Sequence, residues 1–199
     1  MLKYILSVLV GYLCGSVSVA VLMTKKKYGT DVRTAGSGNA GATNVARVFG
    51  MKAGVMTLGG DMLKTAVSGL AGWLLCGYDG LAVACLGCII GHCWPLYFHF
   101  KGGKGVSVGA CIALLLDWRF FLVLVVWFFF WFVISRRVSV CSLLCALVYP
   151  WAFYLFHPQV DLSFVVCCLI GVMVIFLHRS NIGRILRGEE AKFKPKSAQ

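Results

Sequence analysis

Long apolar runs separated by short polar segments make up most of the chain. A helix needs about 20 residues to cross the roughly 30 Å hydrocarbon core of a bilayer. Seven runs approach or reach this length, at about residues 2–23, 53–76, 80–98, 106–116, 120–134, 138–156 and 162–177. The pattern predicts an all-α, polytopic integral membrane protein of about seven transmembrane helices, forming one domain over residues 1–199. The fourth and fifth runs are short, and a re-entrant third–fourth pair would lower the number of crossings.

Details within the runs refine this prediction. The first run is followed by Lys25, Lys26 and Lys27 rather than by a small-residue cleavage site, which predicts a retained helix and not a signal peptide. Pro150 predicts a kink in the sixth run. The composition agrees with a membrane protein, because 60% of the residues are hydrophobic and only 13% are charged. A soluble domain carries about a quarter charged residues.

The distribution of basic residues predicts an orientation. With the N-terminus outside and alternating spans, the outer side receives only Lys3 and Arg119. The other side receives Lys25, Lys26, Lys27, Arg33, Arg47, Lys52, Lys101, Lys104, Arg136, Arg137, Arg179, Arg184, Arg187, Lys192, Lys194 and Lys196. Since basic loops mark the cytoplasmic side, the C-terminus is predicted to be cytoplasmic. The net charge of +12 then reflects topology and anionic lipid headgroups rather than nucleic acid.

The first of three polar stretches covers residues 36–44 and continues to Arg47. Its glycines Gly36, Gly38 and Gly41 match a dinucleotide fingerprint, but that fingerprint requires a preceding strand, and here a membrane helix precedes it. Glycines let backbone N–H groups approach a phosphate, and an arginine supplies a charged fork. We expect an anion site with Arg47 and the neutral donors Ser37, Asn39, Thr43 and Asn44. The alternative is a loop that caps a helix through Thr43 or Asn44.

The second polar stretch, residues 91–106, combines His92 with Gly102, Gly103 and Lys104. Its spacing is not that of a P-loop, yet backbone N–H groups and one ammonium at the start of a helix favour an anion. The alternatives are a flexible basic turn at the membrane interface and a structural histidine.

The third polar stretch follows the last run. His178, Asn181 and Arg184 are spaced by three residues, so a continuing helix would align them, and Glu190 follows. The alternative is a juxtamembrane basic tail that binds lipid headgroups, but Asn181 and Glu190 do not fit such a tail. If the runs cross a bilayer, all three stretches fall on the same face.

Charged and sulfur-containing residues inside the runs have structural explanations. Asp61 and Lys64 lie three residues apart in an apolar run, which predicts an internal ion pair that also shapes the site. The ten cysteines include Cys85 and Cys88 near His92, but they lie in apolar helices without a second spaced pair. Free cysteine behaves as a small buried hydrophobe, so no metal site and no disulfide framework is predicted.

Together these motifs resemble the bacterial membrane glycerol-3-phosphate acyltransferases that use acyl phosphate, the PlsY family. The likeness covers essentially the whole chain. It rests on Asp31-x-Arg33 through Arg47, Asp61-x-x-Lys64, residues 91–106, and Asn181-x-x-Arg184 through Glu190. Thr65, Ser107 and Ile185 replace residues more usual in the family, and the segment from Arg137 to Ser142 matches only in part.

The resemblance implies acyl transfer from acyl phosphate to the 1-hydroxyl of sn-glycerol 3-phosphate, which gives lysophosphatidic acid and phosphate in phospholipid biosynthesis. It further implies a multi-pass protein of the bacterial inner membrane with a cytoplasmic active site, without metal or other cofactor, and we expect it to work as a monomer beside membrane lipid. The implied catalytic and substrate-binding residues are Ser37, Asn39, Thr43, Asn44, Arg47, His92, Gly102, Gly103, Lys104, Ser142, His178, Asn181 and Glu190.

The expected mechanism is positioning and charge stabilisation, because no histidine is followed by an aspartate five residues on. Ser37, Asn39, Thr43 and the glycines would hold acyl phosphate, while glycerol phosphate would be held by Arg47, Lys104, His178 and Asn181. A substrate phosphate would accept the hydroxyl proton. The main alternative is a small organic-anion transporter, which predicts polar residues on both membrane faces and often an internal repeat.

Overall fold

The computed structural model describes residues 1–195, and every regular element in that range is a helix. Two compact units divide the chain, one formed by Met1–Val108 with the end from Lys194, the other by Gly109–Phe193. Each unit is described separately. Lys196, which the sequence assigns to the cytoplasmic side, lies outside the described residues.

The first unit contains helices that correspond to the first three apolar runs. Its elements are α1 (Leu2–Gly15), α2 (Val19–Tyr28), η1 (Val32–Thr34), α3 (Ala42–Phe49), α4 (Met51–Cys93) and η2 (Leu96–Phe98), with α5 (Val106–Leu116) beginning at its end. The first run is not one continuous helix, because α1 ends at Gly15 and Ser18 begins α2 by accepting the backbone N–H of Val21. The first predicted apolar run continues through this break, because Gly15, Ser16 and Ser18 interrupt an otherwise apolar run only briefly.

The long helix α4 is two helices joined at a sharp break. Cys76 and Gly77 have non-helical backbone angles, and Gly77 has φ +65°, a conformation that glycine adopts without steric cost. The two halves contact each other where Gly72 faces Gly80, so closely that a Cβ on either would overlap the other's carbonyl. The break confirms the predicted boundary between the second and third apolar runs.

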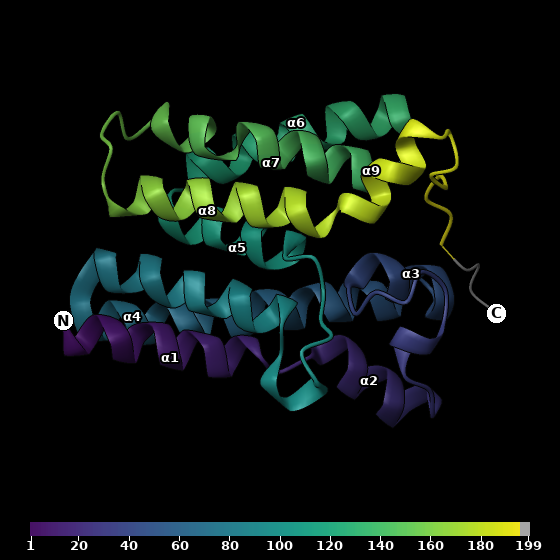
Figure 1. Cartoon of the computed structure of the whole chain (residues 1–199), viewed down its shortest axis with the longest axis horizontal. Helices are drawn as coiled ribbons and strands as arrows, with labels where there is room; N and C mark the ends of the chain where they lie inside the picture. Colours follow the sequence, from purple (N-terminus) through teal and green to yellow (C-terminus); the bar gives the residue numbers. More distant parts are fainter. Residues whose placement is uncertain (196–199) are drawn as a thin grey trace. The chain divides into compact units, whose positions relative to one another are not determined.

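Glycine contacts also join α1 to the second half of α4 (Figure 1). Gly11 and Gly15 of α1 approach the backbone of α4, while Gly87 and Gly91 of α4 approach the backbone of α1. In both helices the glycines are four residues apart, the spacing that lets membrane helices pack with their backbones in contact. The paired positions rise together along both helices, so the two run parallel, as the alternating topology predicts.

The second unit contains the rest of α5 with α6 (Trp118–Ser135), α7 (Val138–Tyr154), α8 (Leu162–Leu177) and α9 (Arg179–Leu186). In Figure 1, α7 lies beside both α6 and α8. Phe120 packs edge-on against Tyr149 and Phe153, and the Tyr149 hydroxyl donates to the Gly109 carbonyl at 2.8 Å.

Helix lengths support a membrane protein without fixing the number of crossings. In the described part of the chain, Leu2–Tyr28, Met51–Phe98 and Trp118–Ser135 are long and apolar enough to span a bilayer, and α8 with α9 forms a bent fourth candidate. Val106–Leu116 and Val138–Tyr154 are shorter apolar helices. Seven crossings with an outside N-terminus therefore remain a prediction.

Candidate active site

The first polar stretch is folded around the side chain of Asn44. Its amide nitrogen donates to the carbonyl oxygens of Val32, Ala35 and Asn39 at 3.0–3.2 Å, and its amide oxygen accepts the Ser37 N–H at 2.9 Å. Asn44 is 1% exposed. Because the loop backbone engages both ends of the amide, Asn44 shapes the loop and is not the free donor to an anion that the sequence suggested.

The other polar side chains of this stretch differ from Asn44, because they do not bind the loop backbone. No residue in the described range forms a hydrogen bond or ion pair with the side chains of Ser37, Asn39, Thr43 and Arg47. Helix α3 begins after Gly41 without a side-chain cap, so Thr43 does not cap it as the alternative interpretation supposed. Thr43 and Arg47 lie four residues apart, on one face of α3. Arg47 is half-buried, so its guanidinium remains accessible to an external anion.

The second polar stretch contains a glycine loop, residues 99–105, that folds back against His92. The Gly103 N–H donates to the His92 carbonyl at 3.1 Å, and a Cβ at Gly103 would overlap the imidazole ring. A Cβ at Gly102 would overlap the same carbonyl. Lys104 follows and is half-buried. Close packing against His92 therefore requires glycine at both positions, whether or not their backbone N–H groups also bind an anion.

His92 belongs to a buried charge cluster formed with Asp61, Lys64 and Ser107. Lys64 Nζ lies 3.1 Å from Asp61 Oδ1 and 3.0 Å from His92 Nδ1, and Ser107 Oγ donates to Asp61 Oδ2 at 2.8 Å. Asp61, Lys64 and His92 are at most 8% exposed. The Asp61–Lys64 ion pair predicted from the sequence is thus present. His92 Nδ1 also lies 3.5 Å from Asp61 Oδ1, so the imidazole contacts both members of the ion pair.

The same ammonium stabilises the break between α1 and α2. Lys64 Nζ donates to the carbonyl oxygens of Gly15 at 3.0 Å and of Val17 at 2.9 Å. Backbone carbonyls freed at a helix break inside a membrane need partners, because no water is available there. Lys64 supplies them from a different helix.

The third polar stretch converges on the carboxylate of Glu190. Asn181 Nδ2 donates to Oε1, as does the hydroxyl of Ser139, and Arg184 Nε donates to Oε2 at 2.7 Å. The Arg137 guanidinium donates to the Glu190 carbonyl oxygen. Burial favours a raised pKa for Glu190, but the hydrogen bonds from Ser139, Asn181 and Arg184 outweigh it and lower this pKa.

Two further predicted residues lie in the second unit. The Ser142 hydroxyl is buried in α7 and donates to the Val138 carbonyl at 2.9 Å. The sequence predicted that one helix continues from the last apolar run through Arg184. That prediction is wrong, because His178 lies at a bend of 55° between α8 and α9. Its Nδ1 donates to the Val174 carbonyl at 2.8 Å, and the same carbonyl accepts the His178 backbone N–H at 3.1 Å. Asn181 and Arg184 still share one face of α9.

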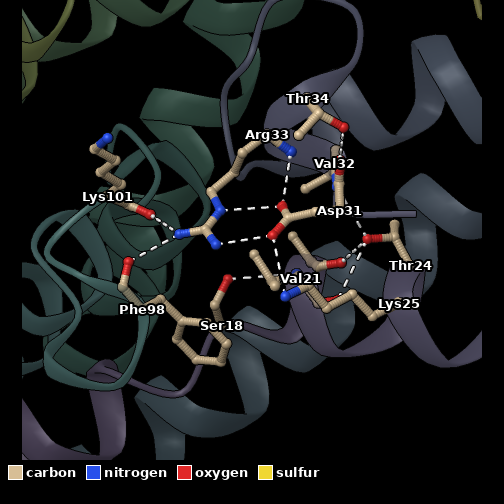
Figure 2. A network of polar contacts seen from close by, with 11 residues as sticks. Ser18, Val21, Thr24, Lys25, Asp31, Val32, Arg33, Thr34, Phe98 and Lys101 are labelled. Atoms are coloured by element: carbon tan, nitrogen blue, oxygen red, sulfur yellow. Dashed lines mark hydrogen bonds and ion pairs between the residues drawn. The ribbon is translucent and has the colours of Figure 1, made fainter. Parts of the chain in front are cut away.

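Figure 2 shows a fourth group of contacts, centred on Asp31 and Arg33. The Arg33 guanidinium donates to both carboxylate oxygens of Asp31, through Nε at 3.0 Å and Nη2 at 2.8 Å. Hydrogen bonds from Arg33 hold the pKa of the Asp31 carboxyl well below its ordinary range. Lys25 approaches the same carboxylate at 3.3 Å.

Sequence reasoning found most of these groups but missed several of their partners. Ser107 and Ser139 bind the buried carboxylates, yet a single serine beside an apolar run carries no distinguishing signal. Arg33 was counted as a cytoplasmic cation and as part of the Asp31-x-Arg33 motif, but its ion pair with Asp31 was not predicted. Cys85, Cys88 and Cys93 are buried thiols that are not joined in disulfides. Across residues 1–195 no group of three or more His, Cys, Asp or Glu residues could hold a metal ion.

Comparisons with known proteins agree over almost the full length of the chain. The family model described as glycerol-3-phosphate acyltransferase matches residues 5–188. A glycerol-3-phosphate acyltransferase of Rubrobacter xylanophilus is 39% identical over 198 residues, which cover 97% of this chain and 96% of the relative. One from Chromobacterium violaceum is 37% identical over 191 residues, covering 93% and 92%.

Solved structures show the same similarity. The crystal structure of PlsY (YgiH), an integral membrane glycerol 3-phosphate acyltransferase, in its glycerol 3-phosphate form has a TM-score of 0.87, with 32% identity and 96% of each chain covered. Its lysophosphatidic acid form has a TM-score of 0.84, with 30% identity, covering 96% of this chain and 95% of the other. This chain therefore belongs to the glycerol-3-phosphate acyltransferase family and is an integral membrane protein with the PlsY fold.

Proposed function

We propose that this protein transfers an acyl group from acyl phosphate to the 1-hydroxyl of sn-glycerol 3-phosphate. The products are 1-acyl-glycerol 3-phosphate and inorganic phosphate. Family membership supports the acceptor and the reaction type, because the related crystal structures are of glycerol 3-phosphate and lysophosphatidic acid forms. The acyl phosphate donor is what the resemblance of the sequence motifs to the PlsY family implies.

The observation that carries this proposal is the set of side chains in the first polar stretch that the described residues leave without partners. Ser37 and Thr43 supply hydroxyl groups, Asn39 supplies an amide and Arg47 supplies a guanidinium. These are the donors that phosphate oxygens require, and the Asn44 side chain fixes the loop that carries them.

In the proposed reaction, the 1-hydroxyl oxygen attacks the acyl carbonyl carbon. The bond between that carbon and the phosphate oxygen breaks, inorganic phosphate leaves, and the hydroxyl proton passes to a substrate phosphate. Acyl phosphate already carries a good leaving group, so orientation and charge stabilisation can supply most of the catalysis. His92 would serve this site through its contacts with the glycine loop and with the Asp61–Lys64 ion pair.

The remaining assignments follow the same proposal. Gly102, Gly103 and Lys104 would bind a substrate phosphate. Ser142, His178, Asn181 and Glu190 are further catalytic or substrate-binding residues that the family resemblance implies. The active site would face the cytoplasm of a bacterial cell, in a monomer embedded in the inner membrane, since basic residues concentrate on that side of the predicted topology. Asp61 and Lys64 would shape the site.

The test uses purified protein free of divalent metal, supplied with glycerol 3-phosphate and either palmitoyl phosphate or palmitoyl-CoA. We expect phosphate release and lysophosphatidic acid with palmitoyl phosphate, and neither product with the CoA donor. Arg47→Met should lower kcat/KM by about a hundredfold or more, as expected when a charged hydrogen-bond partner of a transferring substrate is lost. Activity with the CoA donor alone would refute the proposal. So would glycerol phosphate uptake into vesicles without product formation, the result expected of a transporter.

A further inference from the structure

The glycine loop contains two residues in an uncommon backbone conformation. His99 and Phe100 both have φ +57°, in the left-handed region that residues with a Cβ rarely adopt. Such a conformation persists only where surrounding contacts hold it in place. The Phe100 N–H donates to the Pro95 carbonyl at 3.0 Å, but this bond lies within the same turn. A contact from elsewhere in the fold is therefore needed to define the loop.

Arg33 provides this contact from a segment more than 60 residues earlier. Its Nη1 donates to the Phe98 carbonyl at 2.8 Å and to the Lys101 carbonyl at 3.2 Å. These two carbonyls bracket the left-handed pair, so one nitrogen holds both ends of the strained turn (Figure 2). The guanidinium also lies over the Phe98 ring, 5.9 Å from its centroid.

Asp31 fixes the orientation of that guanidinium. It binds the opposite edge of the fork, and its Oδ1 also accepts the Arg33 backbone N–H at 3.0 Å. A planar guanidinium can bind a carboxylate on one edge and carbonyls on the other, whereas a lysine ammonium cannot span both at these distances. The Arg33 side chain is 18% exposed, which limits competition from water.

Gly102, Gly103 and Lys104 begin directly after the second carbonyl that Arg33 binds. On their other side the Gly103 N–H is bonded to His92. We propose that Asp31 and Arg33 form a positioning pair that sets the shape of the glycine loop and thereby the affinity for the substrate phosphate bound there. The effect on affinity rests on the proposed function, while the effect on loop shape does not. Neither residue takes part in the chemistry.

The test compares Arg33→Lys with a control variant, Arg119→Lys. The control is matched because Arg119 pairs with Asp117 as Arg33 pairs with Asp31. Asp117 and Arg119 have the same spacing and the same fork contacts, through Nε at 3.1 Å and Nη2 at 2.7 Å, but they cap α6. Amide hydrogen exchange over residues 98–105 measures loop order. Steady-state kinetics with palmitoyl phosphate and glycerol 3-phosphate separate KM from kcat.

We expect Arg33→Lys to speed exchange across residues 98–105 and to raise KM for one of the two substrates about tenfold, the scale of one charged hydrogen bond. The kcat should change far less, and Arg119→Lys should leave exchange in this segment and both KM values unchanged. If Arg33→Lys does not fold, Asp31→Asn keeps the guanidinium while weakening its orientation, and should show the same pattern in smaller measure.

Unchanged exchange in both Arg33→Lys and Asp31→Asn would overturn the proposal. Faster exchange without any change in KM would overturn its link to phosphate affinity. A wild-type protein that is inactive with palmitoyl phosphate would instead refute the proposed function, and the exchange comparison would still test the loop.

Discussion

Lys64 is predicted to contribute more to stability than its partner Asp61. Four atoms that can accept a hydrogen bond surround the three N–H groups of the ammonium, namely Asp61 Oδ1, His92 Nδ1 and the carbonyl oxygens of Gly15 and Val17. Among the described residues, Lys64→Met would leave the buried Asp61 carboxylate with only Ser107 Oγ at 2.8 Å and the His92 ring at 3.5 Å, and would deprive two carbonyls at a helix break of this donor. Breaking a buried ion pair from one side costs about 3–5 kcal/mol.

Asp61→Asn should cost less, about 1–3 kcal/mol, because the ammonium keeps three of its acceptors. For Lys64→Met the expected change in the unfolding equilibrium constant is roughly two to nearly four orders of magnitude. The double variant should cost less than the sum of the two, since it leaves no uncompensated charge.

Unfolding in mixed micelles by titration with SDS, followed by tryptophan fluorescence, measures these differences. Lys3→Met is the matched control, because it makes the same substitution at an exposed position of α1. The reasoning fails if Lys64→Met lies within about 1 kcal/mol of the wild type, or if Asp61→Asn proves the costlier change.

Two further predictions concern the polar stretches. Gly103→Ala should lower kcat/KM about a hundredfold, because the added Cβ would push the loop off the His92 ring. The control is Gly59→Ala, which should leave activity intact because a Cβ there meets no atom within 4 Å. Equal activities of the two variants would contradict this prediction. Because the folded-state pKa of Glu190 is lowered, its stabilisation is complete above the ordinary value of 4.5 and is lost as the pH falls through the folded value. The difference in unfolding free energy between wild type and Glu190→Gln should therefore be constant near neutral pH and shrink in acid, and a constant difference down to pH ~3 would refute the assignment.

Hydropathy predicted the helices well because burial in lipid depends on local composition. The boundaries of α6 and α8 follow the apolar runs closely, and the break at Gly77 lies in the gap between two runs. The break after Gly15 was missed for a physical reason. Its carbonyls are satisfied by Lys64, which lies 49 residues further along the chain, and the local signal is only Gly15, Ser16 and the N-cap Ser18 within an apolar run.

The sequence indicated which residue types would form the candidate site, but it did not indicate the role of each residue. Glycine, asparagine and arginine in the first stretch indicated an anion site, yet Asn44 serves the loop backbone while Arg47 keeps its guanidinium unpaired within the described residues. The two residues are three positions apart in one helix. Only the folded backbone decides which of them points inward, and that depends on carbonyls from Val32 and Ala35.

The contact between Lys64 and the broken first helix also bears on how the protein enters the membrane. A lysine and an aspartate at the centre of a helix each oppose insertion by about 2.5–3.5 kcal/mol. The carbonyls of Gly15 and Val17 are synthesised earlier than Lys64, so they can reach the bilayer before the charged helix does. The break between α1 and α2 thus provides acceptors for the Lys64 ammonium, which would otherwise resist leaving water. These acceptors come earlier in the chain than the lysine that needs them.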